Sequence, residues 1–256
     1  MRAIRFCFLV GLGVAVALGA PERPRCSSRP LLSEDYYSRI ESIFEIAIKA
    51  PASVHPEALI RAKEIIRMML QDIRPDIRER LASKGASLAI IPKSQYVTAL
   101  PEFSYLSGRR DVNGNAYDSF KVRGLGAKSQ PVSATSEENL LKLPDDPFKA
   151  EDITVHEFAH AIMNLGFAKE DIDKVTSLYK YALEKNLFVG SFAMVRLDEF
   201  WAELSQSFFN VNNEIGGPDD IGSQLPEALE FLRAIYSFSE SCYPVEFAIS
   251  WENDLF

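Results

Sequence analysis

The sequence has few of the residues that most enzymes use as nucleophiles or metal ligands. Its 256 residues include 3 histidines and 3 cysteines. No serine lies in a G-x-S-x-G turn, and no glycine-rich phosphate-binding loop precedes a predicted helix, so neither an α/β-hydrolase site nor a P-loop is indicated. Positive charge is also in deficit, with a formal net charge of −8. This balance argues against nucleic acid or an anionic membrane surface as the main partner.

A long apolar run lies in the first twenty residues. Arg2 and Arg5 provide a basic start, residues 6–18 are apolar, and residues 17–20 include the small residues alanine and glycine that suit cleavage. This layout is typical of a cleaved signal peptide at residues 1–20. The alternative is an uncleaved anchor, which is disfavoured because the run is shorter than the roughly 20 residues of a spanning helix. We therefore expect a secreted, extracellular protein with no membrane contact after cleavage.

The use of cysteine agrees with export. Cys7 lies within the predicted signal peptide, so the mature chain keeps Cys26 and Cys242. We expect a Cys26 to Cys242 disulfide in an oxidising compartment, with free or separately paired thiols as the alternative. Residues 21–35 are predicted to form an extended lead-in or a short propeptide, and residues 36–256 a single domain.

The remaining pattern predicts an α+β fold, with a small sheet followed by a mostly helical C-terminal half. Strands are expected at 87–91 and, as an edge strand, at 139–143, whereas the apolar residues 36–50 fit either a helix or a strand. Residues 96–128 are irregular, which predicts a surface loop of the kind that walls a cleft. Helices are expected to start at Pro56, Pro75, Asp152 and Pro226 and to cover 171–186 and 197–210, with 213–222 as a loop.

The candidate metal-binding and catalytic residues are grouped in the run His156-Glu157-Phe158-Ala159-His160, which holds two of the three histidines. Two histidines four residues apart project from one side of a helix, so their imidazoles can converge on one tetrahedral metal ion. Glu157 then lies beside the open coordination position, where it can accept a proton from a water whose pKa the metal lowers. Because this short pattern also occurs by chance, the alternative is a buried helix with two hydrogen-bonded histidines.

A catalytic zinc ion needs a third protein ligand. The best source is the helical run from Asp198 to Glu203. The chain between His160 and this run is long enough for one antiparallel helix and a return. We predict Glu199 as the ligand and Glu203, four residues later on the same face, as the acceptor of a ligand histidine's free N–H. Asp198 is weaker because it points roughly 100° away from Glu199. The alternative is that all three acids face solvent on an amphipathic helix.

With these motifs the sequence resembles the gluzincin metallopeptidases, and most closely the peptidase domain of the anthrax lethal factor type and its secreted fungal and animal relatives. The resemblance rests on the HEFAH motif and on Glu199-Phe-Trp-Ala-Glu203. Further similarities in order are Gly124-Leu125-Gly126, the EENLL run at 137–141, and residues 206–210.

The resemblance implies a zincin-like fold with one zinc ion (Zn2+) per chain, held by His156, His160 and Glu199, and Glu157 as general base. It also implies that the expected edge strand lines the substrate cleft and pairs with an extended peptide. The residues expected to line the cleft in this way are Asn139, Leu140 and Leu141.

One position departs from the pattern of these relatives. They have a tyrosine seven residues before the third ligand, where its hydroxyl stabilises the oxyanion or protonates the leaving amine, and this chain has Phe192 there. A phenyl ring cannot donate that hydrogen bond, and losing one oxyanion donor costs roughly 100- to 1000-fold in rate. Tyr105, Tyr179 and Tyr181 are the other candidates for this hydroxyl.

Three functions follow from the sequence. The leading hypothesis is a secreted zinc endopeptidase that acts as a monomer on a peptide or protein in extended conformation. The alternative, motivated by Phe192, is a secreted zinc-binding pseudopeptidase that works as a binding or effector protein. A metal-free structural domain is the third possibility.

Overall fold

The computed structural model describes residues 33–212 and 214–236. The predicted signal peptide, most of the lead-in, Cys26 and Cys242 lie outside the described residues, so the expected disulfide stays a prediction. Within the described part, no helix is long and apolar enough to cross a membrane.

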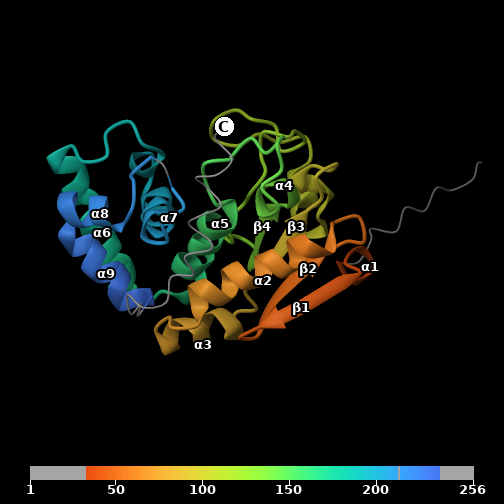
Figure 1. Cartoon of the computed structure of the whole chain (residues 1–256), viewed down its shortest axis with the longest axis horizontal. Helices are drawn as coiled ribbons and strands as arrows, with labels where there is room; N and C mark the ends of the chain where they lie inside the picture. Colours follow the sequence, from red (N-terminus) through yellow and green to blue (C-terminus); the bar gives the residue numbers. More distant parts are fainter. Residues whose placement is uncertain (1–32, 213, 237–256) are drawn as a thin grey trace, which may run out of the picture. The chain divides into compact units, whose positions relative to one another are not determined.

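A four-stranded mixed sheet forms the N-terminal half of the fold (Figure 1). After a short helix α1 (Ser33–Tyr36), the chain forms an antiparallel hairpin. Its second strand pairs in parallel with the next strand, which pairs in parallel with the last. In sheet order, which is also chain order, the strands are β1 (Arg39–Ile43), β2 (Ile46–Ala50), β3 (Ser87–Ile91) and β4 (Val132–Ser136).

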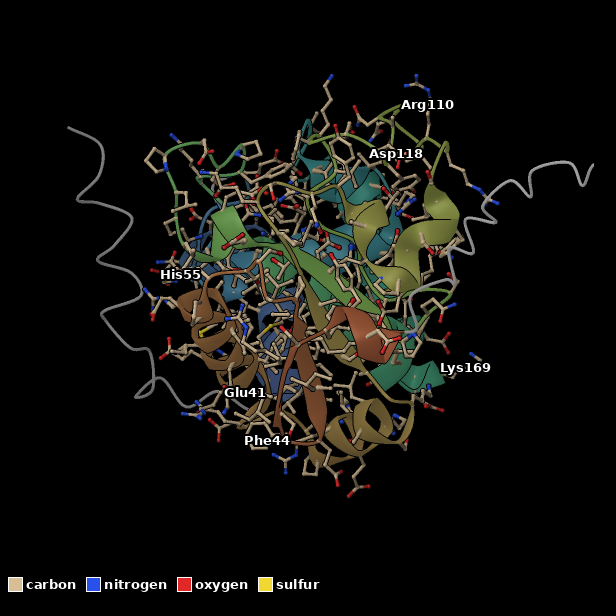
Figure 2. All side chains as sticks on the ribbon, turned by 90° about the vertical axis from the view of Figure 1, so that its right-hand side faces the viewer. Glu41, Phe44, His55, Arg110, Asp118 and Lys169 are labelled. Carbon is tan, nitrogen blue, oxygen red and sulfur yellow. The ribbon has the colours of Figure 1, made fainter. Side chains whose placement is uncertain are left out.

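The hairpin decides the conformation of the early apolar run at 36–50, for which the sequence left helix and strand open. Phe44 and Glu45 both adopt positive φ, at 49° and 64°, between paired residues Ile43 and Ile46. A two-residue turn with positive φ at both positions matches the twist of an antiparallel pair. Figure 2 shows Phe44 at one end of the molecule and Arg110 and Asp118 at the other.

Two hydrophobic clusters cover the two faces of the sheet. Leu88 and Ile90 of β3 face a large cluster that includes side chains of the helices, and Ala89 and Ile91 face a smaller one with Val97 and other residues of the irregular region. A strand buried on both faces reads as a continuous apolar run, which is why β3 was predicted within its observed bounds.

The helices begin largely where the sequence predicts. Helix α2 (Pro56–Leu70) has proline in its first turn, and His55 caps it by accepting the Glu57 N–H at 3.2 Å. Helix α3 (Pro75–Ser83) is followed by Gly85, whose φ of 69° suits a helix stop. The later helices are α5 (Ile153–Ala161), which continues as one wider turn at Ile162–Gly166, α6 (Lys169–Lys185), α7 (Leu197–Phe208), α8 (Pro218–Gln224) and α9 (Pro226–Tyr236). Helix α8 corrects the expected loop at 213–222, because Pro218 starts a helix there.

Helix α5 joins the sheet to the helical half. It packs on β4 on one side and on α7 on the other, as Figure 1 shows. The Trp201 indole N–H donates to the Ala159 carbonyl at 2.9 Å and joins α7 to α5 within the buried core. This packing places side chains of α5 and α7 opposite each other.

The prediction of an edge strand at 139–143 is wrong. Residues 137–140 form a short helix, α4 (Glu137–Leu140), which directly follows β4. The fully buried Asn139 amide accepts the Ile153 N–H at 2.9 Å and donates to the Glu151 carbonyl at 3.0 Å. A short apolar run has no reliable period, so the tertiary contacts of Asn139 at the start of α5 decided its conformation.

The edge of the sheet lies in the irregular region instead. Leu125 exchanges two backbone hydrogen bonds with Ala134 of β4, at 3.0 and 2.7 Å, in an antiparallel bridge. We call residues 122–126 the edge segment. It continues the sheet beyond β4, next to α5.

Candidate metal centre

Helix α5 presents both histidines of the central motif on one side. Its N-cap is Asp152, as predicted, and the Asp152 carboxylate accepts the N–H groups of Thr154 and Val155 at 2.9 and 3.1 Å. The rings of His156 and His160 lie one turn apart, with centroids separated by 5.0 Å. Both side chains are buried.

Helix α7 brings Glu199 to the same point. One carboxylate oxygen, Oε2, lies 3.1 Å from Nε2 of His156 and 3.3 Å from Nε2 of His160. The three ligand atoms all lie within 4.8 Å of one another. Among the described residues, these three side chains form a group of histidine and acidic residues that could hold a metal ion. Two imidazoles and one carboxylate are a donor set of catalytic zinc sites, so these residues fit the ion.

A hydrogen-bond network fixes the His156 ring. Its Nδ1 lies 3.0 Å from Oε1 of Gln206 and 3.3 Å from Oε1 of Glu203. Because the Gln206 amide nitrogen donates to the Asp152 carbonyl at 3.0 Å, the amide oxygen faces the ring and accepts from it. The proton of His156 is therefore assigned to Nδ1, which leaves the Nε2 lone pair for a metal.

Gln206 is a site residue for which the sequence predicted no role. It follows Glu199 by seven residues and Glu203 by three, so all three side chains share one face of α7. In the sequence, this spacing was the signal that could have identified Gln206 as a site residue. Glu203, the predicted acceptor, lies near the same ring nitrogen, with its Oε1 3.3 Å from Nδ1 of His156.

Groups of opposite charge are paired at this centre. Burial disfavours the charged form of His156, but its hydrogen bonds with Glu199 and Glu203 outweigh burial and raise its pKa well above the ordinary value. Burial likewise opposes ionisation of Glu199, yet hydrogen bonds from the two histidines lower its pKa. These opposite shifts pair the Glu199 carboxylate with the imidazole at the point where the ligand atoms converge.

Glu157 lies between the metal position and the edge segment. Burial raises the pKa of its carboxyl group above the ordinary range, although the neighbouring histidines oppose this effect. A Cβ atom on Gly124 would overlap the Glu157 carboxylate, and one on Gly126 would come within 2.6 Å of Cδ2 of His160. Glycine at both positions therefore lets the edge segment lie directly against the face of α5 that carries Glu157 and His160.

An open cleft of about 580 Å³ lies over the metal position. Its floor includes the three ligands and Glu157, and the edge segment forms one wall. Residues 111–117 of the predicted cleft-walling loop, the start of α5 and residues 192–199 also contribute. The predicted cleft residues Asn139, Leu140 and Leu141 do not line it, because the edge they were expected to form belongs to residues 122–126.

Phe192 lies at this cleft, beside the metal position. Its ring centroid is 6.3 Å from that of His156, and 36% of the residue is exposed. None of the three tyrosines proposed to replace its missing hydroxyl lines the cleft. The Tyr179 hydroxyl donates to the Met194 carbonyl at 3.1 Å, the Tyr105 hydroxyl pairs with Ser129 at 3.0 Å, and Tyr181 lies at the surface of α6. Tyr117, which the sequence did not single out, does line the cleft.

Comparison with known proteins supports the fold. The sequence matches no protein-family model and no curated protein. The solved structure of the PRO-PRO endopeptidase PPEP-2 from Paenibacillus alvei is similar to this chain, with a TM-score of 0.50 and 17% sequence identity. The similarity covers 72% of this chain and 95% of that one. At this identity the similarity establishes the fold alone, and the predicted zincin-like α+β class is confirmed.

Proposed function

We propose that the protein is a zinc-dependent endopeptidase. The observation that carries this proposal is the convergence of His156, His160 and Glu199 beneath an open cleft, with Glu157 beside them. The similarity in fold to an endopeptidase supports it. His156, Glu157 and His160 of α5 and Glu199 of α7 come together only when these two helices pack in the folded chain.

Zinc held by these three residues would supply Lewis-acid chemistry, polarising the scissile carbonyl and lowering the pKa of water. The chain's own contribution to proton transfer is Glu157. Its carboxylate lies beside the ligand histidines and lines the cleft, within reach of a water and a scissile bond held there. Glu157 therefore takes a proton from the attacking water and delivers it to the leaving amine.

The edge segment is the proposed binding site for an extended peptide. Because the N–H and C=O groups of Leu125 point to Ala134, those of Gly124 and Gly126 point to the opposite side in an antiparallel strand. That side faces the cleft, which both glycines line. A peptide adding as a further strand would place its main chain across the metal position. The proposal replaces the predicted role of Asn139, Leu140 and Leu141.

We also propose that the enzyme acts outside the cell as a monomer and is related to the lethal factor type of gluzincins. The signal-peptide layout of residues 1–20 supports the extracellular location, and the order of motifs supports the relation to the lethal factor type. Mass spectrometry of the protein from a culture medium tests the first, since cleavage after Ala20 gives a defined N-terminus.

Replacing the general base tests the proposed activity. Glu157→Gln keeps the shape of the side chain and removes its basicity, so purified protein should retain one zinc ion per chain. Cleavage of an unfolded protein such as reduced casein should fall by roughly 100- to 10,000-fold. Glu230→Gln, an exposed change on α9, is the control and should cleave like the wild type. Cleavage that survives Glu157→Gln would refute the mechanism.

Phe192 favours a second candidate function, a zinc-binding pseudopeptidase that acts as a binding protein. Its ring occupies the side of the cleft next to His156 and brings no hydrogen-bond donor. On this hypothesis the wild type binds zinc without cleaving, and Phe192→Tyr creates measurable cleavage. An active wild-type protein would rule the hypothesis out.

A further inference from the structure

We propose that Arg196 supplies the oxyanion donor that Phe192 lacks, by presenting its guanidinium group to the scissile carbonyl oxygen. This inference rests on the proposed endopeptidase function and assigns a catalytic residue within it. It starts from the position of Arg196 directly before α7, four residues after Phe192 in the same wall of the cleft.

The guanidinium group is held next to a metal ligand. Its Nη2 donates to Oε1 of Glu199 at 2.8 Å, while Oε2 of the same carboxylate faces the two histidines. The positive charge of Arg196 is therefore one carboxylate group away from the point where the ligand atoms converge. An oxyanion that develops at this point would lie in the field of a fixed cation.

Asp198 fixes the orientation of the guanidinium group. Its two carboxylate oxygens accept hydrogen bonds from Nε and Nη2 of Arg196, at 2.9 and 2.8 Å. This bidentate contact gives Asp198 a role other than metal ligation, because its carboxylate pairs with Arg196 and not with the histidines. Bidentate pairing restricts the rotation of an arginine more than a single contact does.

One nitrogen of Arg196 remains available. No residue of the described chain accepts a hydrogen bond from Nη1 of Arg196, and 39% of the side chain is exposed where it lines the cleft. A bound peptide can therefore reach this donor. Since a guanidinium group does not lose its proton in proteins, Arg196 stabilises negative charge, and the leaving amine still receives its proton from Glu157.

Two other side chains of the cleft also carry donors. The Lys128 ammonium group lies 3.8 Å from Asp198, but its side chain is 74% exposed and no contact with Glu199 is present. Tyr117 lines the cleft, but among the described residues its hydroxyl makes no hydrogen bond with any of the three ligands. Arg196 combines a donor, a fixed orientation and direct contact with a metal ligand, and these two residues do not.

Binding of a tetrahedral anion tests the assignment independently of cleavage. The probe is a phosphinic pseudopeptide, whose phosphinate resembles the oxyanion, titrated calorimetrically into protein with one zinc ion per chain. Arg196→Met should weaken its affinity by roughly 100-fold or more, the effect of losing one oxyanion donor. Arg61→Met removes an arginine that also pairs with an acid three residues later, on α2 outside the cleft, and should bind the probe like the wild type.

A second variant separates donation from a structural role. In Arg196→Met, the added change Phe192→Tyr restores a donor to the same wall and should recover at least tenfold of the lost affinity. Equal probe binding by the wild type and Arg196→Met would overturn the assignment, as would a loss found in Tyr117→Phe or Lys128→Met instead. A wild type that binds the probe but cleaves nothing would refute the endopeptidase proposal while the probe affinities still decide the role of Arg196.

Discussion

Glu151 is a partly buried carboxylate at the start of α5 that lines the cleft. No described residue donates a hydrogen bond to its side chain, and its carbonyl oxygen accepts from Asn139. Burial, reinforced by the negative charge of Glu203 and Glu214, raises the pKa of Glu151 to about 7. The folded protein therefore holds a proton on Glu151 at pH values where the unfolded chain, with a pKa of 4.5, has released it.

The free energy of unfolding should record this difference. As pH rises from about 4.5 to 7, the folded state must give up a proton that the unfolded state has already lost, so Glu151 lowers stability increasingly and its full cost is present above pH 7. Glu151→Gln should match the wild type at pH 4.5 and exceed it at pH 8 by on the order of 1 kcal/mol. Urea unfolding in EDTA at both pH values measures this difference, and a gap that does not grow with pH would contradict it.

At the scale of elements, the edge segment is held near its start by the contacts of Arg123, and its two glycines pack against α5. The buried Arg123 guanidinium pairs with both carboxylate oxygens of Glu138 and donates to the Gln95 carbonyl at 2.6 Å. Separating a buried ion pair is costly because it leaves an uncompensated charge. The pair of Arg123 and Glu138 therefore fixes the position where the edge segment begins. Gly124 and Gly126 then pack against different functional side chains of α5.

Alanine at these two glycines should therefore give different defects. Gly126→Ala places a methyl group within 2.6 Å of the His160 ring, so zinc affinity should fall by at least tenfold. Gly124→Ala displaces Glu157, which is not a ligand, so cleavage should fall while zinc affinity changes little. Zinc competition titrations and casein cleavage, measured on both variants, check this contrast. Identical defects in the two variants would mean that the segment moves as a unit.

For the whole molecule, the metal position connects helices that are far apart in the chain. His156 and Glu199 are separated by 43 residues, and α6 lies between them in sequence. A ligand that binds only the folded state stabilises it by mass action, by about 4 kcal/mol at 1,000 times its dissociation constant. Zinc should therefore stabilise the contact between α5 and α7 and the fold with it.

Removal of zinc should lower the thermal midpoint. At roughly 2 to 4 °C per kcal/mol for a domain of this size, EDTA is expected to reduce the melting temperature by about 10 °C, and added zinc should restore it. His160→Gln removes a ligand and should melt at a temperature that EDTA does not change. Differential scanning calorimetry measures both proteins, and a wild type insensitive to EDTA would argue against a bound metal.

The sequence by itself determined the features that depend on near neighbours. The four-residue spacings of His156 with His160 and of Glu199 with Glu203 place each pair on one helix face, because the helical period is local. Asp152 as a cap and the buried strand β3 follow from equally local preferences.

Only the tertiary structure decided which segments meet. The pairing of Leu125 with Ala134, which moved the cleft wall away from residues 139–143, depends on a partner outside the segment itself. The contacts of Gln206 with Asp152, and of the edge-segment glycines with α5, likewise join residues distant in sequence. Short apolar or polar runs take the conformation that buries them best against such partners, and that competition is settled by packing rather than by local propensity.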